Sequence, residues 1–204
     1  MDLEKRWIAL WPDAIPNRVA EAYAVLHAHY RGRPYHNLEH ITQCLGQLDK
    51  VKVSFRSLAV EVALWYHDAI YDPKRKDNEE WSVDLAHKEM HELDAPYAFR
   101  HRVGELILAT KHNKQVDDPE AQTIVDIDLH TLGGSAKEYE EYSKAIRQEY
   151  DWVPEADYIK GRVAVLKSFL DRPHIYYTDH FRQFYEQTAR RNLAEEIRRL
   201  NQPQ

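Results

Sequence analysis

Apolar residues recur every three or four positions along most of the chain, which predicts a succession of amphipathic α-helices. Pro16 and Asn17 open the first clear segment, and Gly32 with Pro34 closes it. Its apolar positions are Val19, Ala22, Tyr23, Leu26 and Tyr30. Asn37 is placed to cap the next helix. The apolar positions of that helix are Leu38, Ile41, Leu45 and Leu48.

The segment that follows is apolar on nearly every side. We expect a helix from about Ser57 to Tyr71 that is ended by Pro73, because proline lacks the amide hydrogen that continues a helix. One charged residue, Glu61, interrupts its apolar run. A helix without a polar face is a buried helix, so this segment is predicted to lie in the core.

Start and stop signals mark the remaining helices. The expected boundaries are a start at Asp77 or Asn78 with an end near Leu93, a start after Pro96 with an end near Thr110, a start at Asp118-Pro119-Glu120 with an end at Gly133-Gly134, a start at Ser135 with Glu138 as its capping-box partner, a start at Pro154, and a start near Thr178. No segment has the alternating pattern of a strand, and no internal repeat is found. The prediction is an all-α fold in which residues 1–204 form one helical domain.

Composition narrows the function further. The 204 residues carry 28 Lys and Arg against 34 Asp and Glu, a net charge of −6, so no overall basic field favours nucleic acid. No leader-like start and no apolar run of roughly 18 residues is seen, so we expect a cytoplasmic protein. The single cysteine, Cys44, excludes an internal disulfide and a cysteine-based zinc finger. Twelve histidines are the unusual feature, and they direct the search to a metal site because histidine is the commonest metal ligand.

Helical phase separates two carboxylates in the segment that starts at Asp118. Counted at about 100° per residue from Ile124, Asp126 falls on the far side of the helix and is expected to be solvated. Asp128 falls inside the apolar arc. A buried carboxylate is costly unless it is hydrogen-bonded, paired or metal-bound. Asp128 is therefore a candidate metal ligand, with a hydrogen-bonded cap or a salt bridge as the alternative.

Histidines at two other places stand beside apolar helical segments. His67 and Asp68 follow the buried run, where the alternative to a chemical role is a pair that caps the helix end or bonds a neighbouring helix. His40 lies to the side of the apolar stripe of its helix, next to Cys44 in helical phase. His36 precedes the same helix. Taken singly, His36 and His40 fit ordinary structural or surface positions.

In order along the chain, His40, His67-Asp68 and Asp128 resemble the H…HD…D signature of the HD-domain superfamily of metal-dependent phosphohydrolases. Residues 34–41, 65–72 and 126–133 carry the resemblance, and residues 172–176 and 189–193 also fit its predicted small bacterial branch, so it covers most of the chain. The resemblance implies an HD-type helical bundle that holds one divalent ion, Mn²⁺, Fe²⁺, Zn²⁺ or Mg²⁺. The implied ligands are His40, His67, Asp68 and Asp128, and Asp68 could also reach a second, weaker ion.

The segment Tyr35-His36-Asn37 with His40 also resembles the first metal motif of cyclic-nucleotide phosphodiesterases. In those enzymes the earlier histidine donates a proton and the later one binds the metal, so His36 is the implied general acid here. The second histidine motif of those enzymes is not matched, because Asp72-Pro73-Lys74 stands where it would begin. This departure argues against a cyclic nucleotide as the substrate.

The resemblance implies hydrolysis of a phosphoester or phosphoanhydride, with a nucleotide as the expected small-molecule substrate and metal-activated water as the nucleophile. His36 and Asp68 are the expected catalytic residues. Lys111, His112 and Asp72 are candidates for substrate binding, the first two through phosphate and Asp72 through a second metal or its water.

The alternative function is a catalytically silent helical module that binds a metal or senses a nucleotide. A His36→Ala variant separates the two, because an enzyme would lose turnover and keep its metal. Nucleic acid is not an expected partner, since two of the three short basic runs lie on a final helix that also carries glutamates. No membrane partner is expected, and the chain is expected to be a monomer or a homodimer.

Overall fold

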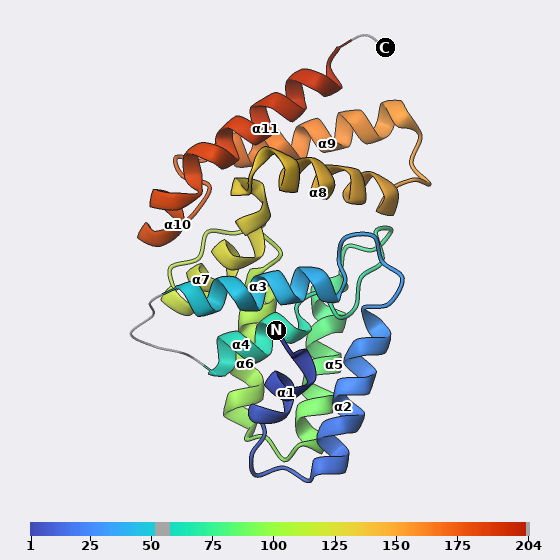
Figure 1. Cartoon of the computed structure of the whole chain (residues 1–204), viewed down its shortest axis with the longest axis vertical. Coiled ribbons are helices and arrows are strands. Elements are labelled where there is room, and N and C mark those ends of the chain that lie inside the picture. Colours follow the sequence, from blue (N-terminus) through green and yellow to red (C-terminus); the bar gives the residue numbers. More distant parts are fainter. Residues whose placement is uncertain (52–57, 203–204) are drawn as a thin grey trace. The chain divides into compact units, whose positions relative to one another are not determined.

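The computed structural model describes residues 1–51 and 58–202. Within these residues every regular element is helical (Figure 1), which confirms the predicted all-α fold. The helices are α1 (Leu3–Ala9), α2 (Pro16–His29), α3 (Leu38–Lys50), α4 (Leu58–Tyr66), α5 (Asn78–Glu92), α6 (Tyr97–Ala109), α7 (Pro119–Asp128), the 3₁₀ helix η1 (Leu129–Gly133), α8 (Ala136–Glu149), α9 (Glu155–Leu170), α10 (Asp179–Phe184) and α11 (Glu186–Leu200). None of the described helices is long and apolar enough to cross a membrane.

The chain divides into two compact helical units, Met1–Ile127 and Asp128–Gln204. The boundary falls at the last residue of α7, so the first unit holds α1 to α6 with nearly all of α7, and the second holds η1 and α8 to α11. The prediction that all residues fold as one domain stays a prediction.

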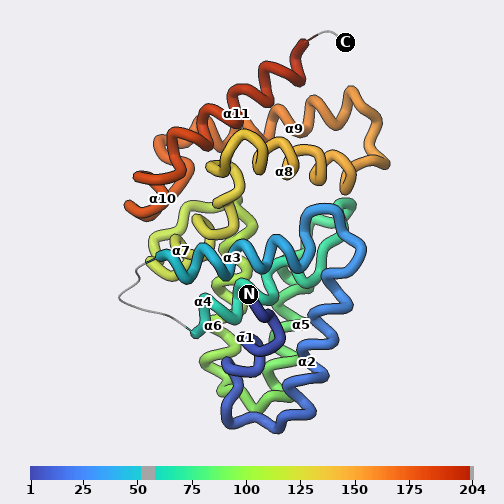
Figure 2. Tube along the Cα trace, viewed as in Figure 1, coloured from blue at the N-terminus to red at the C-terminus, as the bar shows by residue number. Residues whose placement is uncertain are grey.

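The first unit is organised around α6, which packs against both α4 and α5; the three helices can be followed along the trace in Figure 2. Helix α3 also packs against α4, and α1 against α2. As expected for a helix without a polar face, α4 is buried continuously from Ala59 to Tyr66. Trp7 of α1 is fully buried with its ring centroid 5.4 Å from that of Trp65, and its indole N–H donates to the carbonyl of Val19.

Helix α4 ends at Tyr66, well before the predicted end at Tyr71, and the predicted start at Ser57 lies outside the described residues. The amide of Ala69 donates to the carbonyl of Tyr66, three residues back, so the chain has already left the α-helix in a tight turn. Pro73 therefore does not end this helix, and the prediction that it does was wrong.

The second unit is built around α11, which packs against α9 and η1. The side-chain amide of Asn192 on α11 donates to the carbonyls of Leu132 and Gly134 and so holds the end of η1. The single helix predicted from Thr178 is instead two, because the chain bends at Tyr185, where φ is −120° and ψ is −30°. The backbone of Tyr185 lies so close to Gly133 that a Cβ there would be 2.8 Å from the Tyr185 carbonyl oxygen.

Two predicted helix starts are confirmed by their caps. The Asn37 side chain accepts hydrogen bonds from the amides of Glu39 and His40 at the start of α3. Ser135 and Glu138 form both halves of the capping box of α8. Helix α1 was not predicted, although Asp2 caps it by accepting from the amide of Lys5.

Candidate metal centre

Helix α3 presents His40 and Cys44 on one face, one turn apart. The Asn37 cap fixes where this helix begins, and an i, i+4 spacing places the two side chains next to each other. The exposed fraction of His40 is 2% and that of Cys44 is 0%. The Cys44 Sγ lies 3.6 Å from His40 Nε2 and 3.8 Å from His40 Nδ1. His40 is therefore a buried residue and not the flanking one that the apolar stripe indicates.

His67 faces His40 from the first position after α4. Its Nδ1 lies 3.0 Å from the carbonyl oxygen of Leu64, and its Nε2 lies 3.3 Å from His40 Nε2. A neutral imidazole that donates from Nδ1 to a carbonyl keeps the Nε2 lone pair for a metal or a proton. The contact with Leu64 thus orients the ring so that its acceptor atom points at His40.

Asp68 places a carboxylate beside both rings. Its Oδ2 lies 3.1 Å from His67 Nε2 and 3.5 Å from His40 Nε2, and 17% of its side chain is exposed. His67 and Asp68 thus supply two adjacent donors from one turn. They can do so because α4 has already ended and the backbone turns at these two residues.

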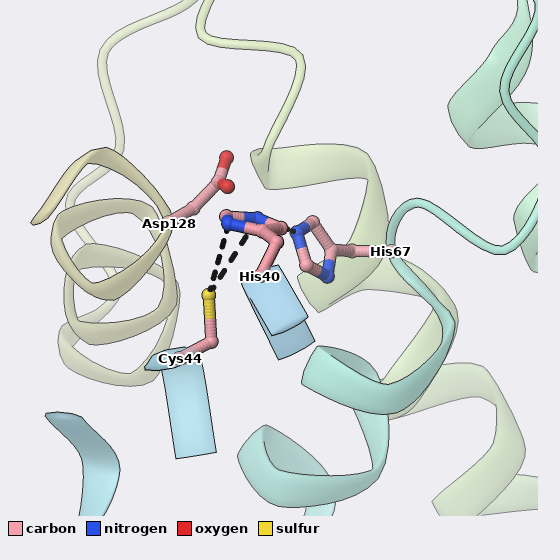
Figure 3. A group of neighbouring side chains, drawn as sticks. All are labelled: His40, Cys44, His67 and Asp128. Atoms are coloured by element: carbon pink, nitrogen blue, oxygen red, sulfur yellow. Dashed lines mark hydrogen bonds between the residues drawn. The ribbon is translucent and has the colours of Figure 1, made fainter. Parts of the chain in front are cut away.

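Asp128 completes a group in which one ligand atom from each of His40, Cys44, His67 and Asp128 lies within 4.8 Å of the others. Figure 3 shows the Asp128 carboxylate directed toward the His40 ring from the end of α7. Asp128 is the last residue of that helix, and the preceding residues of the helix belong to the first unit together with the other three donors. This buried group could hold a metal ion.

Arg33 and Tyr30 support the turn that carries His67 and Asp68. The Arg33 guanidinium donates to the carbonyls of Asp68 and Ala69 and also to that of His36. The Tyr30 hydroxyl donates to the carbonyl of Trp65, and burial, with the nearby charge of Asp68, raises the pKa of Tyr30 well above its ordinary value. Tyr30 therefore stays a neutral donor at this position.

Asp126 does not have the solvated position that helical phase predicts, because its exposed fraction is 0%. The phase argument assumes that one side of the helix faces water. Helix α7 is instead buried without interruption from Thr123 to Ile127, so no such side exists there. The helix also changes to 3₁₀ geometry after Asp128, where a constant turn per residue no longer applies.

His36, the expected general acid, lies half-buried next to this group. Its ring stacks on that of Tyr71 with centroids 3.7 Å apart and an interplanar angle of 21°. The ring centroids of His36 and His40 are 6.2 Å apart. The Tyr35 ring contacts both histidine rings, with a centroid distance of 4.9 Å in each case. The expected acid is thus a neighbour of the expected ligands.

The three expected substrate-binding residues have structural contacts of their own. The Lys111 ammonium binds the Glu80 carboxylate at 2.6 and 2.7 Å, and this hydrogen bond lowers the pKa of Glu80. His112 has a positive φ of 54° just after α6. The Asp72 carboxylate is exposed and accepts the amide hydrogen of Lys74 in a turn. Their role toward a substrate stays a prediction.

Cys44 is the member of the group that sequence reasoning did not count as a ligand. A single cysteine excludes an internal disulfide and a cysteine-based zinc finger, but it does not exclude one sulfur ligand in a mixed site. The available signal was its position one helical turn after His40, which brings the two side chains together once that face is buried.

The donor chemistry of the group fits a divalent cation. The structure brings together two imidazoles, two carboxylates and one thiol, a mixture that binds first-row transition metals. When they are ionised, the carboxylates of Asp68 and Asp128 place negative charge at a largely buried site, and a divalent ion would neutralise that charge. Comparisons of the chain with protein-family models, curated proteins and solved structures found no match.

Proposed function

We propose that the protein is a metal-dependent phosphohydrolase that cleaves a phosphoester or phosphoanhydride, with a nucleotide as its substrate. The observation that carries the proposal is that His40, His67 and Asp128 belong to one largely buried group, and that the Asp68 carboxylate lies beside both of its imidazoles. These residues come from three separate segments, and together they are the ligand set implied by the resemblance to HD-domain phosphohydrolases.

The ligand residues would hold one divalent ion, and the carboxylate of Asp68 would also help to orient the attacking water. When bound, such an ion supplies Lewis-acid chemistry that lowers the pKa of water and stabilises charge on a phosphoryl oxygen. The chain's own contribution is to fix the imidazoles, as the Leu64 carbonyl does for His67, and to limit water around the buried donors.

His36 would donate the proton to the leaving oxygen. A histidine suits this task because its ordinary pKa lies near neutrality. Its stacking on Tyr71 holds the ring in one orientation beside His40 while leaving it half-exposed to an incoming substrate. Lys111 and His112 would contact the phosphate. Lys111 would have to exchange its contact with Glu80 for the substrate.

The first test is phosphate release from a panel of nucleotides and simple phosphoesters in the presence of Mn²⁺. We expect activity in the wild type and none in Asp68→Ala. A His36→Ala variant should keep its metal but lose about 10²- to 10⁴-fold in kcat, the usual contribution of a general acid. His91→Ala is the matched control, because His91 is an exposed histidine on α5, and it should behave as the wild type.

Activity that persists in Asp68→Ala would contradict the proposed site, and a His36→Ala variant with full kcat would remove His36 from the mechanism. A metal-binding module without catalysis is the second candidate function. The burial of His40, Cys44 and His67 favours it, since a structural metal site is filled by protein donors, whereas a catalytic site keeps one position open for water or substrate. Metal binding with no turnover on any phosphate substrate, in the wild type and in His36→Ala alike, is the result expected for such a module.

A further inference from the structure

We infer that Cys44 is a metal ligand, and that its sulfur makes the centre select Zn²⁺ over Mg²⁺. The inference rests on the metal centre of the proposed function, but it does not depend on which reaction the protein catalyses. It adds a sulfur donor to the nitrogen and oxygen ligands considered so far. Three of the donors, His40, Cys44 and His67, belong to the first unit.

Two of the distances between donor atoms match those between ligands of a tetrahedral zinc ion. Zinc binds nitrogen at about 2.0–2.1 Å and sulfur at about 2.3 Å, so tetrahedral angles place two nitrogens about 3.3 Å apart and a nitrogen and a sulfur about 3.6 Å apart. The His40 Nε2 to His67 Nε2 distance is 3.3 Å, and the His40 Nε2 to Cys44 Sγ distance is 3.6 Å. His67 Nε2 and Cys44 Sγ are therefore each spaced to share one ion with His40 Nε2, and the atoms of the whole group lie within 4.8 Å of one another.

The position of Cys44 on α3 explains why the sulfur is held there. Cys44 follows His40 by one turn of a helix whose start is fixed by the Asn37 cap. Its side chain is fully buried and directed into the group, as Figure 3 shows, with the sulfur beside the His40 ring. Because Cys44 is the only cysteine of the sequence and is buried, an internal disulfide cannot be its role.

A sulfur donor changes which ions the group prefers. Thiolate is a soft ligand that suits Zn²⁺ and Co²⁺, whereas Mg²⁺ demands oxygen ligands and octahedral geometry. On binding, the S–H bond of Cys44 breaks, its proton passes to solvent, and the sulfur electron pair forms the bond to the ion. Neither the sulfur nor the ion changes its oxidation state. The centre should therefore take up Zn²⁺ or Co²⁺ in preference to Mg²⁺.

Cobalt provides a direct readout of the sulfur bond. The full-length protein, freed of metal with a chelator and kept reduced, is titrated with Co²⁺ and followed by absorption spectroscopy. We expect a thiolate-to-cobalt charge-transfer band in the near ultraviolet. Because the chain contains a single cysteine, any such charge-transfer band reports on Cys44.

The Cys44→Ser variant should bind Co²⁺ without the charge-transfer band. Loss of a residue that only orients a ligand costs about 10–100-fold in metal affinity, so loss of the sulfur itself should lower Zn²⁺ affinity by about 100-fold. Competition with a chromophoric chelator measures that affinity, and the affinity for Mg²⁺ should not change. Gln43→Ser is the matched control, because it places the same residue at the exposed neighbouring position of α3. Circular dichroism establishes that both variants are folded.

The outcomes separate the two proposals. Cobalt binding to the wild type without a charge-transfer band, or equal Zn²⁺ affinity in Cys44→Ser and Gln43→Ser, overturns the ligand role of Cys44 and leaves the metal centre standing. A failure of the wild type to bind Co²⁺ or Zn²⁺ at all overturns both the Cys44 inference and the metal centre on which the proposed function rests.

Discussion

The buried charge cluster of the second unit allows a quantitative test of what holds that unit together. Glu196 on α11 accepts two hydrogen bonds from the Arg162 guanidinium, at 2.9 and 3.1 Å, and one from the Tyr139 hydroxyl at 2.5 Å. The side chains of Arg162 and Glu196 are only 8% and 3% exposed. Helix α11 is therefore attached to α9 and α8 through one carboxylate that accepts hydrogen bonds from both helices.

A Glu196→Gln substitution keeps the size of the side chain and removes its charge. It leaves the Arg162 cation buried without a counter-charge, and breaking a buried pair in this way costs about 3–5 kcal/mol. For a chain of this length, about 1 kcal/mol corresponds to a shift of about 2–4 °C in Tm. We therefore expect the Tm of the variant to fall by about 6–20 °C.

Thermal unfolding followed by far-ultraviolet circular dichroism measures this shift. Glu195→Gln is the matched control, because the same change is made one residue earlier at an exposed carboxylate that pairs with Arg198 on the surface. Exposed pairs contribute little to stability, so this control should melt like the wild type. Equal melting temperatures for Glu196→Gln and Glu195→Gln would refute the argument.

The same cluster predicts how stability changes in acid. Burial alone would raise the pKa of Glu196, but the hydrogen bonds and charge of Arg162 outweigh burial and hold the pKa below its ordinary value of 4.5. A carboxyl with a lowered folded-state pKa stabilises the protein above its ordinary pKa and loses that contribution as the pH falls through the folded value. The difference in Tm between wild type and Glu196→Gln should thus be constant near neutral pH and shrink below pH 4.5.

Three further measurements test other parts of the structure. Asn37→Ala removes the α3 cap and should lower the free energy of unfolding by about 1 kcal/mol, as measured in a urea titration; no loss would mean that the cap is not needed. Gly133→Ala should destabilise the protein by about 1–3 kcal/mol through contact with the Tyr185 backbone, whereas Gly161→Ala, with open space around its Cβ, should stabilise it by about 0.5–1 kcal/mol. Thermal melts of the two variants should therefore shift Tm in opposite directions, and shifts in the same direction would contradict the argument. Zn²⁺ at 100 times its Kd should raise the free energy of unfolding by about 2.7 kcal/mol, and a chelator should reverse this increase. A Tm that does not change when Zn²⁺ is added would contradict binding.

Much of the helical fold could be predicted because its signals are local. The Asn37 cap, the Ser135–Glu138 capping box and the start after Pro154 each depend on a few neighbouring residues, and all three are observed. The ends of helices were harder, since they depend on distant parts of the chain. The bend at Tyr185 accompanies close packing on Gly133, far away in the sequence, which no local pattern records.

The candidate site shows the same division. His67 and Asp68 could be found because they end a strongly apolar run, and Asp128 because it falls in an apolar arc. Asp126 was misplaced because α7 is buried from Thr123 to Ile127, and this burial depends on the neighbouring segments and not on the pattern of the helix itself. Cys44 was missed for a related reason: a small residue beside an apolar stripe gives no sign of its environment until the opposing helices are in place.

The hydrogen bonds of Arg33 have a consequence for the rate at which the centre can be loaded. One guanidinium joins the carbonyl of His36, ahead of α3, to the carbonyls of Asp68 and Ala69, beyond α4. The two chain segments that flank the histidine donors are therefore fastened to each other by the protein alone. The loss of chain entropy that brings these donors together therefore occurs on folding, before an ion binds. The rate of metal binding should then depend on how fast the ion loses its hydration shell and not on a rearrangement of the backbone.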